Sequence, residues 1–165
     1  MGKWRDAFEH GRPSFFDIEF GLEYSFGPPA TEEQLAFAEK ELGMPLPADV
    51  REFLSEFNGI RASSAVDREQ GDQPTIAYLD VEFMAVHVSR HLRTCDNELP
   101  SESELRKVVF VYQENGLAGL YGVCTDNFGE FRAGEVVKLD HDVGEFEKAF
   151  PNLLEFVRLG CRNWD

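Results

Sequence analysis

The fold is decided by residues 30–59, which read ATEEQLAFAEKELGMPLPADVREFLSEFNG. Thr31 and Gln34 fit a capping box, in which the hydroxyl accepts a hydrogen bond from the third helical amide and the glutamine side chain reaches back to the cap. An apolar stripe at helical spacing follows, and Gly43 suits the left-handed position that ends a helix. The stripe consists of Leu35, Ala38 and Leu42. We therefore expect an amphipathic helix that ends at Gly43.

A second helix is expected after a short link. Pro47 suits the first helical position, because the N–H that proline lacks would be unpaired there anyway. The pair Asn58-Gly59 supplies the stop signal. The apolar face in between consists of Val50, Phe53, Leu54 and Phe57. The two segments together predict a hairpin of two amphipathic helices.

The C-terminal half has the pattern of an antiparallel sheet. Runs of β-branched and aromatic residues at 108–112, 120–124 and 134–139 predict strands. Reversal signals at 114–116 and 126–129 separate them, so we expect a meander.

Three other segments complete the predicted elements. Residues 76–79 predict a short strand, whereas 83–93 fit either a helix or a strand. The segment 146–150 is expected to begin a helix that Pro151 interrupts and that continues to Gly160.

The first 29 residues are rich in aromatic side chains. Phe16, Ile18 and Phe20 alternate with acidic residues, which predicts a half-buried strand. We find no linker and no internal repeat in the chain. We therefore expect one α+β domain over residues 1–165, with a largely antiparallel sheet packed by helices and the extension 1–29 packed on it.

The charge of the chain limits its partners. Its 165 residues include 31 acidic residues against 16 lysines and arginines, a net charge of −15. Such a surface repels nucleic-acid phosphates and anionic lipid headgroups, because both are bound mainly through lysine and arginine. A basic protein partner is favoured instead. The alternative is that the carboxylates only keep the protein soluble.

Two groups of residues are candidates for a metal. His87 and His91 lie four apart, so on a helix both imidazoles could reach one ion. The segment between them lacks the glutamate of the HExxH pattern, and Arg90 and Arg93 would repel a cation. Asp140-His141-Asp142 matches no complete ligand set, and a solvated turn with a helix cap is the favoured interpretation.

No pattern in the sequence is typical of an enzyme, since GxSxG, GxGxxG and Walker motifs are all missing from it. Cys95, Cys124 and Cys161 form no CxxC pair, which favours a reducing compartment. No apolar run approaches the roughly 18 residues of a membrane span. We expect a cytoplasmic protein that is no enzyme, with no catalytic, cofactor-binding or metal residues.

Phe37 lies outside the apolar stripe of the first helix. It falls about 200 degrees from Leu35 on an ideal helix and so faces away from the stripe. The favoured interpretation is that it covers the N-terminal segment. The alternative is an exposed aromatic residue that anchors a partner.

A family resemblance rests on the helical hairpin. Its motifs are Ala30–Leu35, Glu39–Gly43, Leu46–Asp49, Phe53-Leu54 and Asn58-Gly59. In this order they resemble the signature of the SMI1/KNR4 family of the SUKH superfamily. The resemblance implies an α+β domain. By this resemblance, the chain is similar to bacterial immunity proteins of polymorphic toxin systems, which bind a cognate toxin, frequently a nuclease. The domain is also similar to that of fungal regulatory scaffolds.

The leading hypothesis is a non-catalytic protein-binding module, an immunity protein that covers a basic toxin domain with its carboxylates. The alternative is a regulatory or scaffolding protein that recognises a cellular partner through the same domain. No direct binding of nucleic acid or membrane is expected. The candidate contact regions are the loop 61–74, the turn 126–130 and the segment 140–147, and individual partner-binding residues are left open.

Overall fold

A computed structural model of the chain describes residues 2–11, 21–63, 76–78, 80–81, 84, 99–113, 119–140 and 142–160. The helices within these ranges are α1 (Lys3–Glu9), α3 (Glu32–Leu42), α4 (Ala48–Glu56), α7 (Glu102–Leu105) and α8 (Leu153–Glu155), which a π-helix, Phe156–Gly160, follows directly. The strands are β1 (Glu23–Phe26), β2 (Ile60–Ser63), β3 (Ile76–Tyr78), β4 (Val108–Gln113), β5 (Gly119–Cys124), β6 (Val136–Asp140) and β7 (Glu145–Phe150).

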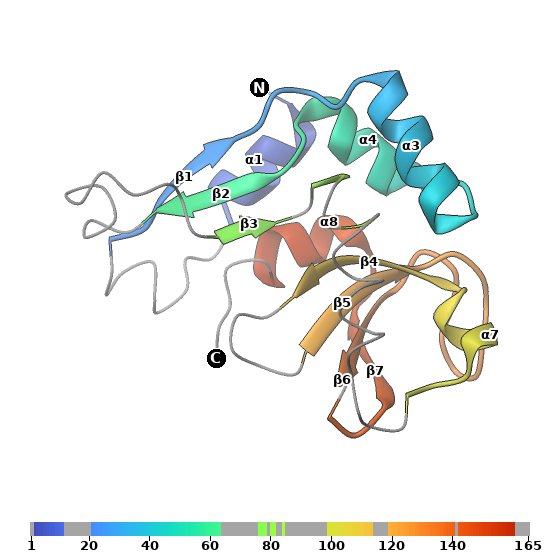
Figure 1. The fold of residues 1–165 in the computed structure, drawn as a ribbon. Coiled ribbons are helices and arrows are strands. Elements are labelled where there is room, and N and C mark those ends of the chain that lie inside the picture. The colour runs from blue at the N-terminus through green and yellow to red at the C-terminus, as the bar shows by residue number, and fades with distance from the viewer. Residues whose placement is uncertain are drawn as a thin grey trace.

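The strands form two sheets in which every neighbouring pair is antiparallel. One sheet has the order β1-β2-β3, and the other is the meander β4-β5-β6-β7. In Figure 1, helices α1, α3 and α4 lie on one side of the molecule and the four-stranded sheet on the other. The chain is therefore an α+β protein with antiparallel sheets packed by helices, as its sequence predicts.

The helical hairpin forms by the predicted local signals. Thr31 Oγ1 accepts the Gln34 N–H at 3.2 Å, and Gln34 Oε1 accepts the Thr31 N–H at 2.9 Å, which completes the capping box. Gly43 ends α3 with a left-handed φ of 70°. The second helix starts one residue later than predicted, because the extended ψ of 143° at Pro47 makes this residue the N-cap. The predicted apolar face of α4 is buried.

The meander is confirmed, but the prediction of a helix at 146–150 is wrong. These residues belong to β7, which pairs with β6 and places Phe146 opposite Leu139. A shift of register beside Val136 sends Phe146 and Phe150 into different apolar clusters. The spacing of four between Phe146 and Phe150 fits one face of a helix. The edge of β6, however, offers backbone N–H and C=O groups for pairing, and the spacing gives no sign of them.

Two apolar clusters lie on opposite faces of the four-stranded sheet. The larger one joins the helices to the sheet face that carries Val109 and Val111, and it continues to the three-stranded sheet through Ile60. The smaller one contains Val108 and Phe110 on the other face of the same strand. Because successive strand residues point to opposite faces, β4 is buried on both.

The N-terminal residues form a helix that the sequence pattern does not predict. Trp4 and Phe8 of α1 are buried in the larger cluster, and the Trp4 ring lies 5.5 Å from that of Phe53. The carboxylate of Glu56 on α4 accepts the N–H groups of Trp4 and Arg5, both at 3.0 Å, so α4 caps α1.

Some predictions fall outside the described residues. These are the strand at 16–20, the helix or strand at 83–93 except Met84, and the reversal at 114–116. The short strand at 76–79 is confirmed as β3 over its first three residues. Within the described part of the chain, no helix is both long and apolar enough for a membrane crossing.

Candidate functional site

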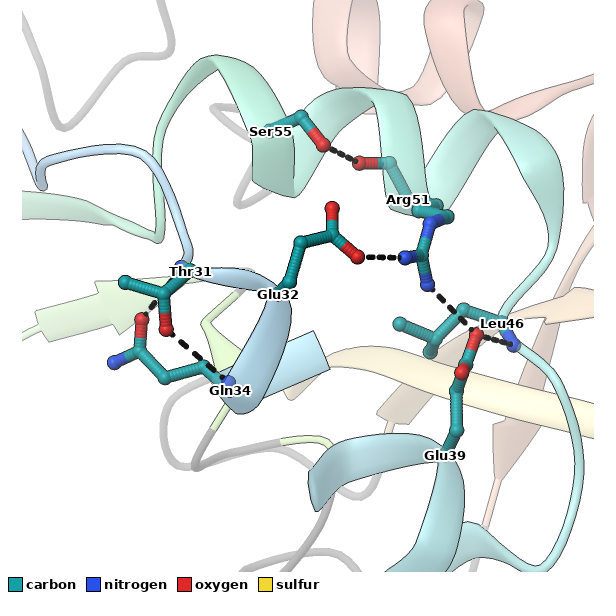
Figure 2. A network of polar contacts seen from close by, with 7 residues as sticks. All are labelled: Thr31, Glu32, Gln34, Glu39, Leu46, Arg51 and Ser55. Atoms are coloured by element: carbon teal, nitrogen blue, oxygen red, sulfur yellow. Dashed lines mark hydrogen bonds and ion pairs between the residues drawn. The ribbon is translucent and has the colours of Figure 1, made fainter. Parts of the chain in front are cut away.

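An arginine between the two helices of the hairpin holds them together. Arg51 of α4 donates to Glu39 of α3 at 3.0 Å and to Glu32, about two turns earlier on the same helix (Figure 2). Glu39 also accepts the N–H of Leu46 in the link at 3.2 Å, as Figure 2 shows. These two carboxylates therefore have partners within the hairpin and are structural.

The hydrogen bond from the Leu46 N–H to the Glu39 carboxylate affects the backbone carbonyls at the end of α3. Gly43 and Met44 donate their N–H groups to the carbonyls of Lys40 and Glu39 at 3.3 and 3.2 Å. The next residue, Pro45, has no N–H, and the N–H of the residue after it goes to the Glu39 carboxylate. Within the described residues, the carbonyls of Glu41 and Leu42 thus accept no hydrogen bond.

A cavity of about 380 Å³ opens beyond this helix end, between α3 and α7. We call it the α3–α7 cavity. Its floor is apolar and includes the buried residues Met84, Val108 and Phe110. Its rim carries Glu41 from α3 and the pair Glu102 and Arg106 from and just after α7.

The charges on this rim are not equivalent. Arg106 donates through Nε to Glu102 at 3.1 Å, so these two charges offset each other. Glu41 is exposed and pairs with no cation in the part of the chain that the structure describes. Among the described residues of the rim, Glu41 is therefore the carboxylate that has no cation as a partner.

The outer face of α3 continues from this rim. Phe37 lies one turn before Glu41 and is 45% exposed, so the alternative of an exposed aromatic residue is the one that the structure shows. Glu33 and Lys40 are exposed on the same face. Phe37 belongs to neither apolar cluster, and whether it contacts residues 12–20 of the N-terminal segment lies outside the described residues.

Two of the predicted contact regions meet at the smaller apolar cluster. The ring of Phe146 on β7 lies 5.4 Å from that of Phe128 and 6.1 Å from that of Phe131. The turn 126–130 therefore folds over the sheet beside the segment 140–147. Of the third region, 61–74, only Arg61 to Ser63 lie within the described residues, as part of β2.

Carboxylates around this cluster differ in their surroundings. The N–H of Arg132 and the ammonium of Lys148, 3.1 Å away, hold the pKa of Glu135 below its ordinary value. Glu130 and Glu145 are exposed and pair with no cation among the described residues. The segment thus adds unpaired negative charge to the surface.

Most of the metal candidates cannot be placed. His87, His91 and His141 lie outside the described residues. Asp140 accepts the N–H of Asp142 at 2.9 Å in the turn between β6 and β7. The turn is as predicted, but a strand rather than a capped helix follows it. Within the described ranges, no three His, Cys, Asp or Glu side chains are grouped for a metal.

The described cysteine is buried. Burial, with a smaller effect from Glu135, raises the pKa of the Cys124 thiol to about 11, so this thiol stays protonated at neutral pH. Cys95 and Cys161 lie outside the described residues.

Sequence reasoning did not predict the α3–α7 cavity. Ser101 and Glu104 form a second capping box, Ser-x-x-Glu, which starts α7, and this signal is visible in the sequence. Pro45 is the other signal, because it lies four residues after Glu41 and has no N–H to donate to the Glu41 carbonyl. Neither signal indicates that the two segments meet in space.

The family is decided by a match over most of the chain. The family model described as SMI1 / KNR4 family (SUKH-1) matches residues 29–159. This chain belongs to the SMI1/KNR4 (SUKH-1) family. The match covers the hairpin, strands β2 to β7 and the α3–α7 cavity, whereas α1 and β1 precede it. No curated protein matches the sequence significantly. SUKH-1 domains are generally of the immunity-protein type and bind protein partners.

Proposed function

We propose that this SUKH-1 domain is a cytoplasmic immunity protein that binds a basic toxin domain, often a nuclease, and neutralises it without catalysis. The family match carries the proposal. The net charge of −15 supports it, because a toxin that binds nucleic acid must present positive charge to phosphates, and carboxylates can occupy the same places.

The exposed carboxylates on both sides of the molecule are consistent with this role. Glu41 and Glu33 lie on α3, while Glu130 and Glu145 lie at the meander, and none of them pairs with a cation among the described residues. Charges of this kind mainly raise the association rate, whereas buried anchors give most of the affinity. A tight complex therefore needs at least one partner side chain that is buried on binding.

The test is coexpression with the protein encoded next to this gene, which the proposal predicts to contain a polymorphic toxin domain. We expect cells that produce both proteins to survive and the two proteins to copurify, with an association rate that falls as salt rises. Absence of both protection and a complex would refute the proposal. A stable complex with a basic host protein instead of the toxin would favour the regulatory alternative.

A further inference from the structure

We propose that the α3–α7 cavity receives an arginine side chain of the basic protein partner, and that Glu41 recognises its guanidinium group. The inference rests on the proposed function, since it specifies the surface and the chemistry through which that partner is bound. Three independent features of the cavity support it: its unpaired acceptors, its apolar floor and the distribution of charge on its rim.

The acceptors are concentrated at the C-terminal end of α3. Among the described residues, the carbonyls of Glu41 and Leu42 accept no hydrogen bond, and both residues line the cavity. A helix of eleven residues carries a partial negative charge at this end, which attracts cations within the last turn. Lysine and arginine side chains commonly bind such terminal carbonyls.

The floor suits the aliphatic part of the same side chain. Met44 and Leu105 are half-buried and line the cavity together with the buried Phe110. The three methylene groups of arginine can lie along such a surface while the charged group stays at the rim. A volume of about 380 Å³ is near the lower limit of ligand pockets, which fits a side chain better than a large cofactor.

The rim favours arginine over lysine. A guanidinium group has five N–H donors in one plane, so it can bind a carboxylate and neighbouring carbonyls together. An ammonium group has three donors and a strongly held hydration shell. Because Arg106 already offsets Glu102, the charge that attracts the incoming side chain is that of Glu41.

The first experiment uses N-acetyl-L-arginine methylamide as the probe, titrated into the ¹⁵N-labelled full chain. The neutral citrulline derivative has nearly the same shape and serves as control, and the lysine derivative tests the choice of cation. We expect the arginine probe to shift the amide signals of Gly43 and Leu105, and the citrulline probe to leave them in place. Glu41→Gln should weaken binding about threefold or more, whereas Glu145→Gln, the same charge change on β7, should not.

The titration has clear contrary outcomes. If the arginine probe shifts neither signal, or citrulline shifts both equally, the cavity is no guanidinium site. Equal binding of the lysine derivative would overturn the choice of arginine. Glu41 is exposed, so its variants are expected to fold, and an unchanged melting temperature verifies this.

The second experiment measures affinity for the toxin domain that the coexpression test identifies. Glu41→Lys and the cavity-filling Leu105→Trp should each weaken the complex by about tenfold or more, while Glu9→Lys, the same charge change at an exposed position of α1, changes affinity less than threefold. If the native chain binds the toxin and both variants bind equally well, the cavity inference fails and the proposed function stands. If no toxin complex forms although the arginine probe binds, the proposed function fails and the cavity site stands.

Discussion

Replacing Glu56 by alanine should detach the cap of α1. The Glu56 carboxylate on α4 accepts the N–H groups of Trp4 and Arg5, each at 3.0 Å. After the change both donors lose their partner, and that of Trp4 is partly buried. Because the substitution places alanine in a helix, α4 itself keeps its helical propensity.

The size of the effect follows from these two bonds. A hydrogen bond to a charged group contributes about 1.5–3 kcal/mol, and loss of a helix cap costs about 1 kcal/mol. The side chain is half-buried, so the lower figures apply, and the two bonds together should stabilise the protein by about 2 kcal/mol. For a chain of this length, that corresponds to a melting temperature lower by about 4–8 °C.

The measurement is equilibrium unfolding in urea, with Glu52→Ala as the matched control. Glu52 lies one turn earlier on α4 and also contacts α1, but only through an exposed ion pair with Lys3 at 2.7 Å. Such a pair contributes about 0.5 kcal/mol or less. If Glu56→Ala costs no more than Glu52→Ala, the capping argument is wrong.

A second variant tests the same contact from the other side. A Cβ atom added at Gly2 would lie 2.0 Å from Oε1 of Glu56, so Gly2→Ala must push the carboxylate away. Its cost should therefore shrink in the Glu56→Ala background. Equal costs in both backgrounds would show that the two residues do not interact.

Three further predictions concern other parts of the fold. Burial raises the pKa of the Cys124 thiol to about 11. In a Cys95→Ser, Cys161→Ser background, this thiol should therefore react with a disulfide reagent at pH 8 only after urea is added. Rapid reaction of the folded protein would contradict its burial. Gly27→Ala should lower the free energy of unfolding by about 2 kcal/mol or more, because the new Cβ would lie 2.2 Å from the Asn58 carbonyl oxygen. Gly21→Ala, with a φ of 55° and open space around it, should lower it by about 1 kcal/mol. Urea midpoints compare the two variants, and the reverse order would refute the steric argument. Hydrogen bonds from the Ser101 hydroxyl and N–H lower the pKa of Glu104. Its contribution to stability is therefore present above the unfolded pKa of about 4.3 and is lost as pH falls through the lower folded pKa. Glu104→Gln should make the loss of stability in acid shallower. Urea midpoints equal to those of the native chain between pH 6 and 3 would contradict this.

The parts of the fold that the sequence predicts are those decided by local signals. The capping box at Thr31 and the left-handed Gly43 each act within one or two turns, so their meaning does not depend on distant residues. The strand β7 is the opposite case. Its residues fit a helical pattern, and only the edge of β6 makes the extended form the stable one.

The candidate site is harder to predict for a similar reason. Helical periodicity correctly places Phe37 outside the apolar stripe, but whether another segment covers it depends on tertiary packing. The α3–α7 cavity joins Glu41 and Leu105, which are distant in sequence and meet only because the hairpin and β4 share one core. Capping signals indicate where each helix begins and ends, and they carry no information about which helix ends come together.

The position of α1 has a consequence for where this protein can be cut. The matched family range begins at residue 29, yet Trp4 and Phe8 fill the same core as Phe53 and Val157. A chain shortened to residues 29–159 would leave that part of the core open to water as an apolar patch. Such a fragment should aggregate and bind other proteins without selectivity. In a screen for partners, the fragment would capture proteins through its exposed core, so a search for the protein partner has to start from the full chain.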